Sequence, residues 1–223
     1  MPDPNLKVSL LEPDEAHLYQ AVRHETFRPT INKILYTNQP EISDTTMANV
    51  IDGIKKGITN DGILYLKCVD QGTGEVIAGA RWRYLGPSAS DWASGVRERT
   101  EEEVEKDLVV PSPYPESDPR VWNQLFAGFA EHKRRDMATR PYYILETLIT
   151  HPLHQRRGAG ALLVNWGCEK ADEKGVECFV EASPMGRPLY ERYGFEECGR
   201  MSVDVGGEEF DFIMMRRPAK VRS

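Results

Sequence analysis

The sequence predicts a globular protein of the α/β class with a single domain. Segments in which apolar and polar residues alternate, as in half-buried strands, are interspersed with segments whose apolar residues recur at helical spacing. The chain has 223 residues, of which 40% are hydrophobic and 28% are charged. This length and composition suit one sizeable core with at most one elaboration, and they exclude a disordered or collagen-like chain.

The N-terminal part of the chain predicts one strand, two helices and an antiparallel hairpin. Alternation ahead of Pro13 is typical of a short strand, and Asp14 can cap the helix that follows. Two further alternating segments flank a glycine-containing loop, as the strands of a hairpin do. We therefore expect strands at 6–10, 63–69 and 76–84 and helices at 14–27 and 44–56.

Residues 86–141 differ in composition from the rest of the chain and predict a helical insertion. An acidic run at 101–105 lies in a segment that fits a helix beginning at Asp91, with the like charges on a solvated face. Asp118 and Pro119 then form the N-cap and first residue of another helix. We expect its apolar stripe to pack on the core or cover a pocket: Trp122, Leu125, Phe126 and Phe129.

The C-terminal part predicts a strand, a loop and a helix, followed by shorter elements. A β-rich segment precedes the glycine-containing loop 155–160, and Gly175 marks the end of the helix after it. We expect strands at 142–150, 178–182, 195–205 and 210–215 and helices at 161–174 and 188–193.

Charge, cysteine spacing and hydropathy exclude several classes of protein. The 35 acidic residues outnumber the 28 Lys and Arg residues and give a net charge of −7, which disfavours general binding to duplex nucleic acid. The four cysteines form no C-x-x-C pair, so we expect neither a metal site nor a disulfide framework. Because no 18-residue apolar run occurs, we expect no membrane span or secretion, and a cytoplasmic location.

The loop 155–160 has the composition of an anion-binding site. Small residues stand where the loop becomes a helix, so free backbone N–H groups at the helix N-terminus can converge on an anion. Gly158 and Gly160 allow a ligand to approach the backbone, and Arg156 and Arg157 add charge-assisted contacts. This combination predicts a pyrophosphate ligand, although the motif is neither G-x-G-x-x-G nor a Walker loop.

Two motifs resemble those of the GNAT (Gcn5-related N-acetyltransferase) superfamily. Gln155-Arg156-Arg157-Gly158-Ala159-Gly160 is similar to the family's Q/R-x-x-G-x-G/A motif, which binds the pyrophosphate of acyl-CoA. Downstream, Leu189-Tyr190-Glu191-Arg192-Tyr193-Gly194-Phe195 resembles the second signature, L-Y-x-x-x-G-F. The surroundings of both motifs look similar to fungal GNAT proteins of mostly unassigned substrate. The resemblance spans about 6–216, and 142–196 carries nearly all of its specificity.

The resemblance implies a fold and a cofactor. The fold is a mixed, mostly antiparallel central sheet flanked by helices, in one domain over 1–223, with the helical insertion at about 86–141 between strands 3 and 4. The cofactor is acetyl-CoA, which serves as the acyl donor. In the family, the strand before the loop binds the pantetheine arm and thioester carbonyl, and the loop binds the pyrophosphate. The matching residues are Leu148, Ile149 and Thr150 on the strand and Gln155, Arg156, Arg157, Gly158, Ala159, Gly160 and Ala161 at the loop.

Three further residues follow from the resemblance. Ser183 stands where the family often has a cofactor-binding asparagine, and its hydroxyl can still form a hydrogen bond. Tyr190 matches the tyrosine proposed to protonate the departing thiolate, which suits a phenol with a pKa of about 10; the alternative is a purely packing role. Glu146 is the leading candidate for the general base, because it lies on the strand that flanks the thioester. Its alternatives are a carboxylate that binds a cationic acceptor, a solvated charge, a histidine (His24 or His132) or a water relay.

The function implied is direct acetyl transfer from acetyl-CoA to an amine of a small molecule. No covalent intermediate is expected, because no cysteine lies in a recognisable nucleophile setting. Two alternatives are a non-catalytic acyl-CoA-binding sensor or interaction module, and a protein or peptide N-acetyltransferase with an open groove. The long insertion favours a small, enclosed acceptor, and the net acidity favours a cationic one.

Overall fold

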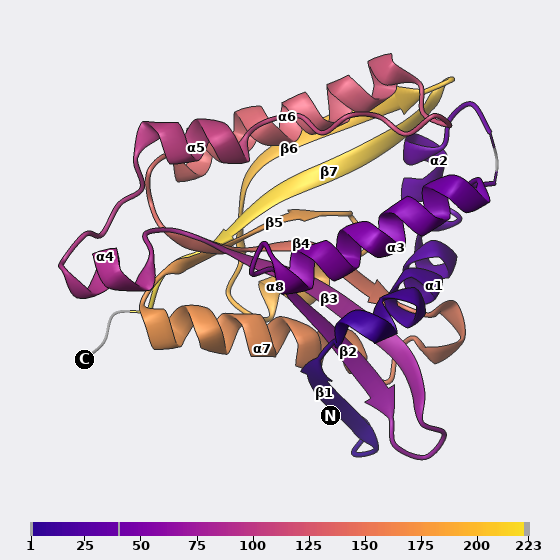
Figure 1. The fold of residues 1–223 in the computed structure, drawn as a ribbon, viewed down its shortest axis with the longest axis horizontal. Helices are drawn as coiled ribbons and strands as arrows, with labels where there is room; N and C mark the ends of the chain where they lie inside the picture. Colours follow the sequence, from indigo (N-terminus) through magenta and orange to yellow (C-terminus); the bar gives the residue numbers. More distant parts are fainter. Residues whose placement is uncertain (1, 40, 221–223) are drawn as a thin grey trace. The chain divides into compact units, whose positions relative to one another are not determined.

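The computed structural model describes residues 2–39 and 41–220 and contains a mixed seven-stranded sheet flanked by helices (Figure 1). The strand order is β1-β2-β3-β4-β5-β7-β6. The strands are β1 (Leu6–Leu10), β2 (Leu64–Asp70), β3 (Glu75–Leu85), β4 (Tyr142–Thr150), β5 (Glu177–Ala182), β6 (Glu196–Val205) and β7 (Glu208–Arg217). The helices are α1 (Ala16–Phe27), α2 (Ile31–Leu35), α3 (Asp44–Thr59), α4 (Ala89–Ala93), α5 (Glu101–Asp107), α6 (Pro119–Met137), α7 (Ala159–Lys174) and α8 (Arg187–Glu191). The predicted α/β class and the helical insertion between the third and fourth strands are confirmed.

The chain divides into two compact units, and each is described by itself. The first unit comprises Met1–Arg83, Tyr114–Ser117 and Leu145–Gly167, and the second comprises Tyr84–Pro113, Asp118–Ile144 and Cys168–Ser223. Each unit draws on segments that are distant in the sequence. The expectation of one domain over the whole chain stays a prediction. In the described part of the chain, no helix combines the length and apolar character that a membrane span needs.

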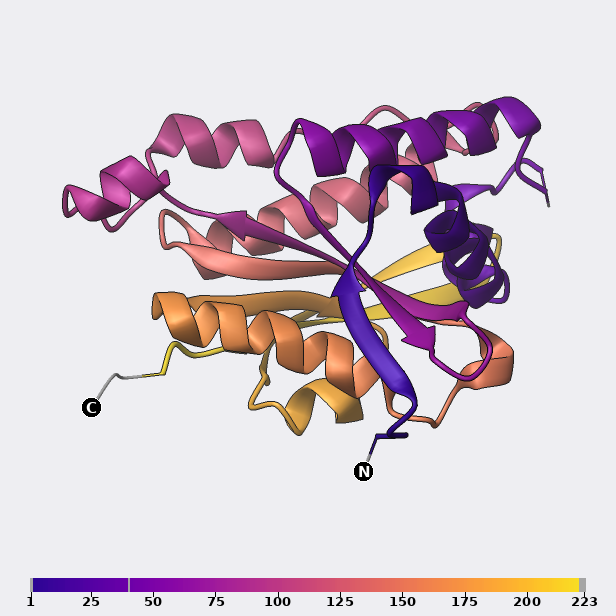
Figure 2. The same cartoon turned by 60° about the horizontal axis from the view of Figure 1, so that its bottom comes forward.

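In the first unit, β1, β2 and β3 are antiparallel neighbours, with the N-terminal strand outermost (Figure 2). Helices α1 and α3 pack together beside these strands. Their inward side chains and those of the strands form one apolar cluster, and burying each large member stabilises the fold by about 1.5–3 kcal/mol. The cluster consists of Leu11, Ala16, Tyr19, Val22, Ile54, Ile63, Tyr65 and Ile149.

Tyr19 fixes how closely α1 approaches the sheet. Its ring lies over Gly79 of β3, where a Cβ atom would come within 2.7 Å of it. It also meets the ring of Tyr65 edge-on, with centroids 5.1 Å apart. Tyr65 lies opposite Arg81 in the β2–β3 register, so Arg81 shares the face that α1 covers. Trp82 faces the other side, is fully buried, and donates its indole N–H to the carbonyl of Leu163 (3.2 Å).

A short segment of the insertion, Tyr114–Ser117, belongs to the first unit and is anchored there by Glu116. The main-chain N–H of Ser43 and the hydroxyl of Thr46 donate to its carboxylate, at 3.1 and 2.9 Å. Burial raises the pKa of Glu116, but these hydrogen bonds outweigh burial and the pKa is lowered. Because Ser43 is the N-cap of α3, the negative charge also lies at the positive end of that helix.

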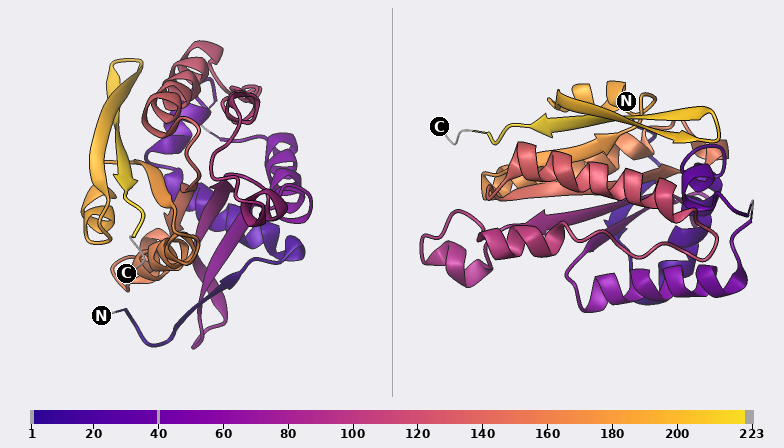
Figure 3. Two further views of the ribbon diagram at one scale, coloured as in Figure 1. Left: turned by 90° about the vertical axis from the view of Figure 1, so that its left-hand side faces the viewer. Right: turned by 90° about the horizontal axis from the view of Figure 1, so that it is seen from above.

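In the second unit, β6 and β7 form the long hairpin at the yellow end of the colour scale in Figure 3, and β5 pairs with β7. The predicted apolar stripe of α6 packs against this hairpin, with the rings of Phe129 and Phe212 5.1 Å apart. Gly128 lets α6 come close to Met201, because a Cβ atom there would overlap its side chain. The stripe therefore packs on the core. This was one of the two expectations; the other was that it covers a pocket.

The prediction of a single helix from Asp91 through the acidic run is wrong. The structure has two short helices, α4 and α5, in its place. Gly95 adopts a positive φ of 92° after α4, which ends a right-handed helix. Thr100 then starts α5 through a capping box with Glu103. Helix α2 was also not predicted, because its five residues are too few to show a helical period.

The contact between α7 and Trp82 predicts a stability effect. We expect Gly167→Ala to lower the free energy of unfolding by about 1–3 kcal/mol, because a Cβ atom at Gly167 would overlap the indole ring. Urea unfolding measures this change. Gly53→Ala is the matched control: it is also a helix-interior glycine, with no atom within 4 Å of the added methyl, and we expect it to be neutral or stabilising by up to about 1 kcal/mol. Equal effects at both positions would contradict the packing described.

Candidate functional site

The loop before α7 turns sharply through two residues with positive φ. Arg156 has a φ of 66° and Gly158 a φ of 93°. The N–H of Leu162 donates to the carbonyl of Gly158 (3.1 Å), so α7 starts at Ala159, two residues earlier than predicted. Ala159 and Gly160 therefore lie in the first turn, where N–H groups have no partner within the helix. This end of the helix has the positive field and the free donors that an anion requires.

Gly158 is required at its position for two reasons. Its φ of 93° is one that side-chain-bearing residues rarely adopt. A Cβ atom there would also lie 2.7 Å from the Cα atom of Pro2. The N-terminal segment is held against the loop, since the N–H of Asp3 donates to the carbonyl of Arg157 (2.9 Å).

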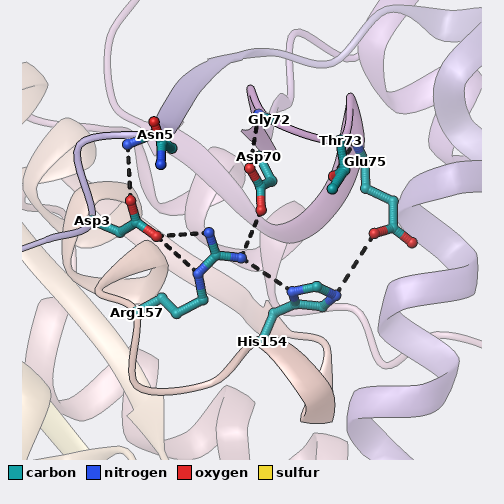
Figure 4. A network of polar contacts seen from close by, with 8 residues as sticks. All are labelled: Asp3, Asn5, Asp70, Gly72, Thr73, Glu75, His154 and Arg157. Carbon is teal, nitrogen blue, oxygen red and sulfur yellow. Dashed lines mark hydrogen bonds and ion pairs between the residues drawn. The ribbon is translucent and has the colours of Figure 1, made fainter.

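The side chain of Arg157 joins three segments of the first unit (Figure 4). Its Nε and Nη2 atoms donate to one carboxylate oxygen of Asp3, at 3.0 and 2.6 Å, and its Nη1 atom donates to Asp70 at 2.8 Å. Nη1 also lies 3.2 Å from Nδ1 of His154, whose other ring nitrogen is 3.8 Å from the carboxylate of Glu75. Arg157 therefore ties the phosphate loop to the N-terminal segment and to the β2–β3 turn.

These contacts shift the ionisation of the groups involved. The carboxylate of Asp3, followed by that of Asp70, raises the pKa of Arg157. The pKa of Asp70 is lowered, first by Arg157 and then by the main-chain N–H of Gly72. The pKa of Asp3 is lowered, first by the N–H of Asn5 and then by Arg157. All three groups are therefore held in their charged forms.

The two arginines of the loop differ in what they contact. The side chain of Arg157 is paired with protein carboxylates. Its predicted role in cofactor binding therefore falls to its main-chain atoms and to the loop conformation that the ion pairs maintain. Arg156 has an exposed side chain and, among residues 2–39 and 41–220, no ion-pair partner. Gln155 is exposed as well. The side chains of Gln155 and Arg156 are thus accessible to a ligand at the loop.

The strand β4 carries both the predicted base and the residues predicted to hold the thioester. Glu146 reaches the face of β3 that carries Arg81. Ile149 packs in the apolar cluster with Tyr19 and Tyr65, which cover the same face. The predicted role of Leu148, Ile149 and Thr150 in binding the pantetheine arm and the thioester stays a prediction.

Glu146, the predicted base, lies between two arginines of β3. One carboxylate oxygen is 2.8 Å from Nε of Arg81, and the other is 3.1 Å from Nη2 of Arg83. The Glu146 side chain is 17% exposed and that of Arg81 is 35% exposed. For the guanidinium of Arg81, burial lowers the pKa, but the nearby carboxylate of Glu146 more than offsets burial and the pKa is raised. The role of Glu146 as a base stays a prediction.

Tyr190 and Ser183 lie in the second unit. Tyr190 is buried and packs edge-on against Phe195, with centroids 5.7 Å apart. Burial raises the pKa of its phenol, so Tyr190 holds its proton more firmly than a solvent-exposed tyrosine does, and its role as the acid stays a prediction. The hydroxyl of Ser183 accepts a hydrogen bond from the N–H of Gly186 at 3.2 Å, which leaves its proton available for donation.

The second unit also contains a surface groove of about 490 Å³ between the hairpin of β6 and β7 and the start of α8. Neither Tyr190 nor Ser183 lines it. Glu197 forms ion pairs with both arginines at the groove, Arg187 and Arg200. The groove is lined by Pro184, Arg187, Arg200, Met201, Ser202, Asp211, Phe212 and Ile213.

The sequence reasoning missed the residues that contact the predicted ones. Arg81 and Arg83 are two residues apart on β3, so the alternation of the strand puts them on one face. Nothing in the sequence indicates that a carboxylate lies between them. Asp3 and Asp70 belong to no motif, and their pairing with Arg157 joins residues more than eighty positions apart. No local sequence signal identifies such a contact.

Comparisons with known proteins agree with the fold and with both motifs. Residues 121–216 match the family model described as an acetyltransferase (GNAT) domain. A protein of Stachybotrys chartarum named acetyltransferase is 33% identical over 79 residues, which are 35% of this chain and 34% of that protein. The chain thus matches about a third of the length of this relative.

Two solved structures illustrate the shared fold. A polyamine N-acetyltransferase of Drosophila melanogaster, described as catalysing the formation of N-acetylagmatine, aligns with a TM-score of 0.62 at 11% identity, over 95% of this chain and 98% of that one. A putative acetyltransferase of Salmonella typhimurium, solved with its cofactor acetyl-CoA, aligns with a TM-score of 0.57 at 13% identity, over 99% and 97%. At these identities, the likeness establishes the fold.

The Arg157 network predicts a pH-dependent stability effect. We expect Asp70→Asn to lower the melting temperature at neutral pH. Because the pKa of Asp70 is depressed in the folded protein from its ordinary value of 3.8, the stabilisation is present above that pH and is lost as the pH falls through the lower folded-state value. Thermal unfolding of the variant and the wild type from pH 7 to pH 3 measures the difference, which should shrink at the acid end.

Glu105→Gln serves as the control for this measurement. It removes an ion pair with Arg134 whose side chains are 54% and 52% exposed, and such pairs contribute little to stability. The melting-temperature difference between Asp70→Asn and the wild type should exceed that of the control and should change with pH. If it stays constant with pH or equals that of the control, Arg157 does not hold the loop through Asp70.

Proposed function

We propose that the chain is an N-acetyltransferase of the GNAT superfamily, whose family model matches residues 121–216, and that it transfers an acetyl group from acetyl-CoA to an amine of a small molecule. The observation that carries this proposal is the loop before α7. Its two positive-φ residues and the first turn of the helix present backbone donors to an anion, and the exposed Arg156 adds a charge. The pyrophosphate of CoA is the anion that this family binds at the matching loop.

In the proposed reaction, β4 and the loop before α7 bind different parts of the cofactor. The main chain of Leu148, Ile149 and Thr150 binds the pantetheine arm and donates to the thioester carbonyl. Residues 155–161 bind the pyrophosphate. Ser183 donates its hydroxyl proton to the cofactor. A main-chain donor at the carbonyl stabilises the negative charge that develops on its oxygen during attack.

The transfer itself is a direct displacement in two stages. Glu146, or a water molecule in contact with it, removes a proton from the acceptor ammonium, and the free amine attacks the carbonyl carbon of the thioester. The new C–N bond forms and the C–S bond breaks as the tetrahedral intermediate collapses. Tyr190 gives its proton to the departing CoA thiolate and recovers one from the amide nitrogen, so the reaction releases one proton overall.

Three observations support a small molecule as the acceptor. The fly enzyme of similar fold is described as acting on a polyamine and forming N-acetylagmatine. The insertion adds α4, α5 and α6 between β3 and β4, and its segment Tyr114–Ser117 is fastened to the first unit by Glu116. A fastened segment of this kind favours an enclosed acceptor over an open peptide groove.

The proposal is tested by binding and by turnover in the same preparation. We expect acetyl-CoA to raise the melting temperature of the purified chain, and thiol release to require both acetyl-CoA and one class of amine. A thermal shift without thiol release from small amines or peptides would favour a cofactor-sensing module. Thiol release with peptides alone would favour a peptide acetyltransferase, and no shift at any concentration would contradict the cofactor assignment.

The role assigned to Tyr190 predicts a specific kinetic change. We expect Tyr190→Phe to lower kcat by about 100- to 10,000-fold and to leave the affinity for CoA unchanged, because the variant keeps the buried ring and loses only the proton donor. Initial rates of thiol release and CoA titration measure the two quantities. Tyr193→Phe is the matched control in the same motif, and it should retain full activity. Full activity of Tyr190→Phe would remove Tyr190 from the mechanism.

A further inference from the structure

We propose that Cys168 of α7 and Cys178 of β5 form a redox-active pair, which hydrogen peroxide converts into an intramolecular disulfide. Both residues lie in the second unit, and both are free thiols in the structure. The proposal does not depend on the acetyl transfer proposed above. It assigns a site of reversible modification to two residues whose spacing in the sequence predicts no disulfide.

The first argument is the position of the two cysteines around Arg217 of β7. Cys178 is the cross-strand partner of Arg217 in the β5–β7 register, so their side chains leave the sheet on the same face. The Nη1 and Nη2 atoms of Arg217 donate to the carboxylate of Asp172 at 2.7 and 2.9 Å. Asp172 lies about one turn after Cys168 on α7, and such residues share a helix face. The ion pair therefore brings the face of α7 that carries Cys168 onto Cys178.

The second argument is the contact between the two thiols. A side-chain hydrogen bond joins Cys168 and Cys178, so their sulfur atoms are already neighbours in the reduced protein. Disulfides form only between cysteines that the fold holds close together. Formation of the S–S bond therefore requires rotation of two short side chains and does not require distant segments of the chain to meet.

The third argument is the ionisation of the pair, which makes Cys168 the thiol that reacts first. The hydrogen bond with Cys178 lowers the pKa of Cys168 and outweighs burial; Arg217 and Lys220 lower this pKa further, and Asp172 opposes them. The pKa of Cys178 is raised, first by the same hydrogen bond and then by burial. Thiolates are the nucleophiles in thiol oxidation. A thiol that loses its proton readily beside one that keeps it suits an attacking and a resolving cysteine.

The depth of the pair determines which oxidant can reach it. Cys168 and Cys178 are 3% and 0% exposed, and buried cysteines are ordinarily inert. This pair differs because a guanidinium and a second thiol stabilise its thiolate. The adjoining ion pair of Asp172 with Lys220 reaches solvent, since these side chains are 21% and 67% exposed. Hydrogen peroxide is about as small as water, so it can enter where a bulky disulfide oxidant cannot.

The reaction balances with peroxide as its only oxidant. The thiolate of Cys168 attacks one oxygen atom of hydrogen peroxide, the O–O bond breaks, and the departing hydroxide takes the proton that Cys168 lost, which gives a sulfenic acid and water. The sulfur of Cys178 then attacks the sulfenic sulfur. The S–S bond forms, the S–O bond breaks, and the hydroxide leaves as water with the proton of Cys178. The two thiols lose two electrons and the peroxide gains them, and a dithiol reductant reverses the change.

The first test treats the folded wild-type chain with hydrogen peroxide, alkylates the remaining thiols and identifies the products by peptide mass spectrometry. We expect the disulfide between Cys168 and Cys178 to form about 10-fold faster than Cys198 is oxidised, and dithiothreitol to reverse it. Cys198 is only half-buried, but burial raises its pKa to about 11 and its thiol donates to the carbonyl of Met214 (3.4 Å). Oxidation of Cys198 ahead of the pair, or a pair that stays reduced in excess peroxide, overturns the proposal.

The second test uses Cys178→Ser, with Cys198→Ser as the matched control and Cys178→Ala as a second variant in case the buried serine disturbs the fold. Without the resolving thiol, we expect peroxide to leave Cys168 as a sulfenic acid, which dimedone traps and mass spectrometry detects. The control should form the disulfide at the wild-type rate. A folded Cys178 variant in which dimedone does not label Cys168, or a control that loses the disulfide, contradicts the assignment.

Discussion

The ion pairs of Arg157 with Asp3 and Asp70 are the interaction on which the rest of the site depends. They join the N-terminal segment, the β2–β3 turn and the loop before α7, and they add to the main-chain hydrogen bonds from Asp3 to Arg157 and from Gln71 to Asn5. The loop itself is unfavourable in isolation, because Arg156 holds a positive φ that costs a non-glycine residue free energy. Contacts around the neighbouring guanidinium offset this cost. The shape that presents the first turn of α7 to an anion is therefore maintained from outside the loop.

A second constraint is the close packing of α1 on the sheet. Gly79 has no side chain, so the ring of Tyr19 can lie directly on β3, and Tyr65 fills the space beside it. These aromatic contacts bring α1 over the same face as Arg81 and Glu146. The cofactor loop and the polar cluster thus have different physical origins: ion pairs hold the first, and apolar packing places the second.

Much of this architecture could be predicted from the sequence, because its signals are local. Alternation and helical spacing located all seven strands and the long helices, and the glycines and arginines of 155–160 located the loop. The break between α4 and α5 was not predicted, because a positive φ at Gly95 and a cap at Thr100 override a continuous helical pattern. The partners of Arg157 and Glu146 could not be predicted, since ion pairs between distant segments depend on the register of the folded sheet. The sequence therefore identified Arg157 as a candidate ligand but not the carboxylates that engage it.

The most direct test of this account is the equilibrium binding of CoA to the purified chain, measured by calorimetry beside the binding of pantetheine, which lacks the pyrophosphate. If the loop and the first turn of α7 supply the affinity, CoA should bind at least about 100-fold more tightly than pantetheine, since charge-assisted hydrogen bonds each contribute about 1.5–3 kcal/mol. Equal affinities, or no binding of CoA, would contradict the assignment of this loop to the cofactor.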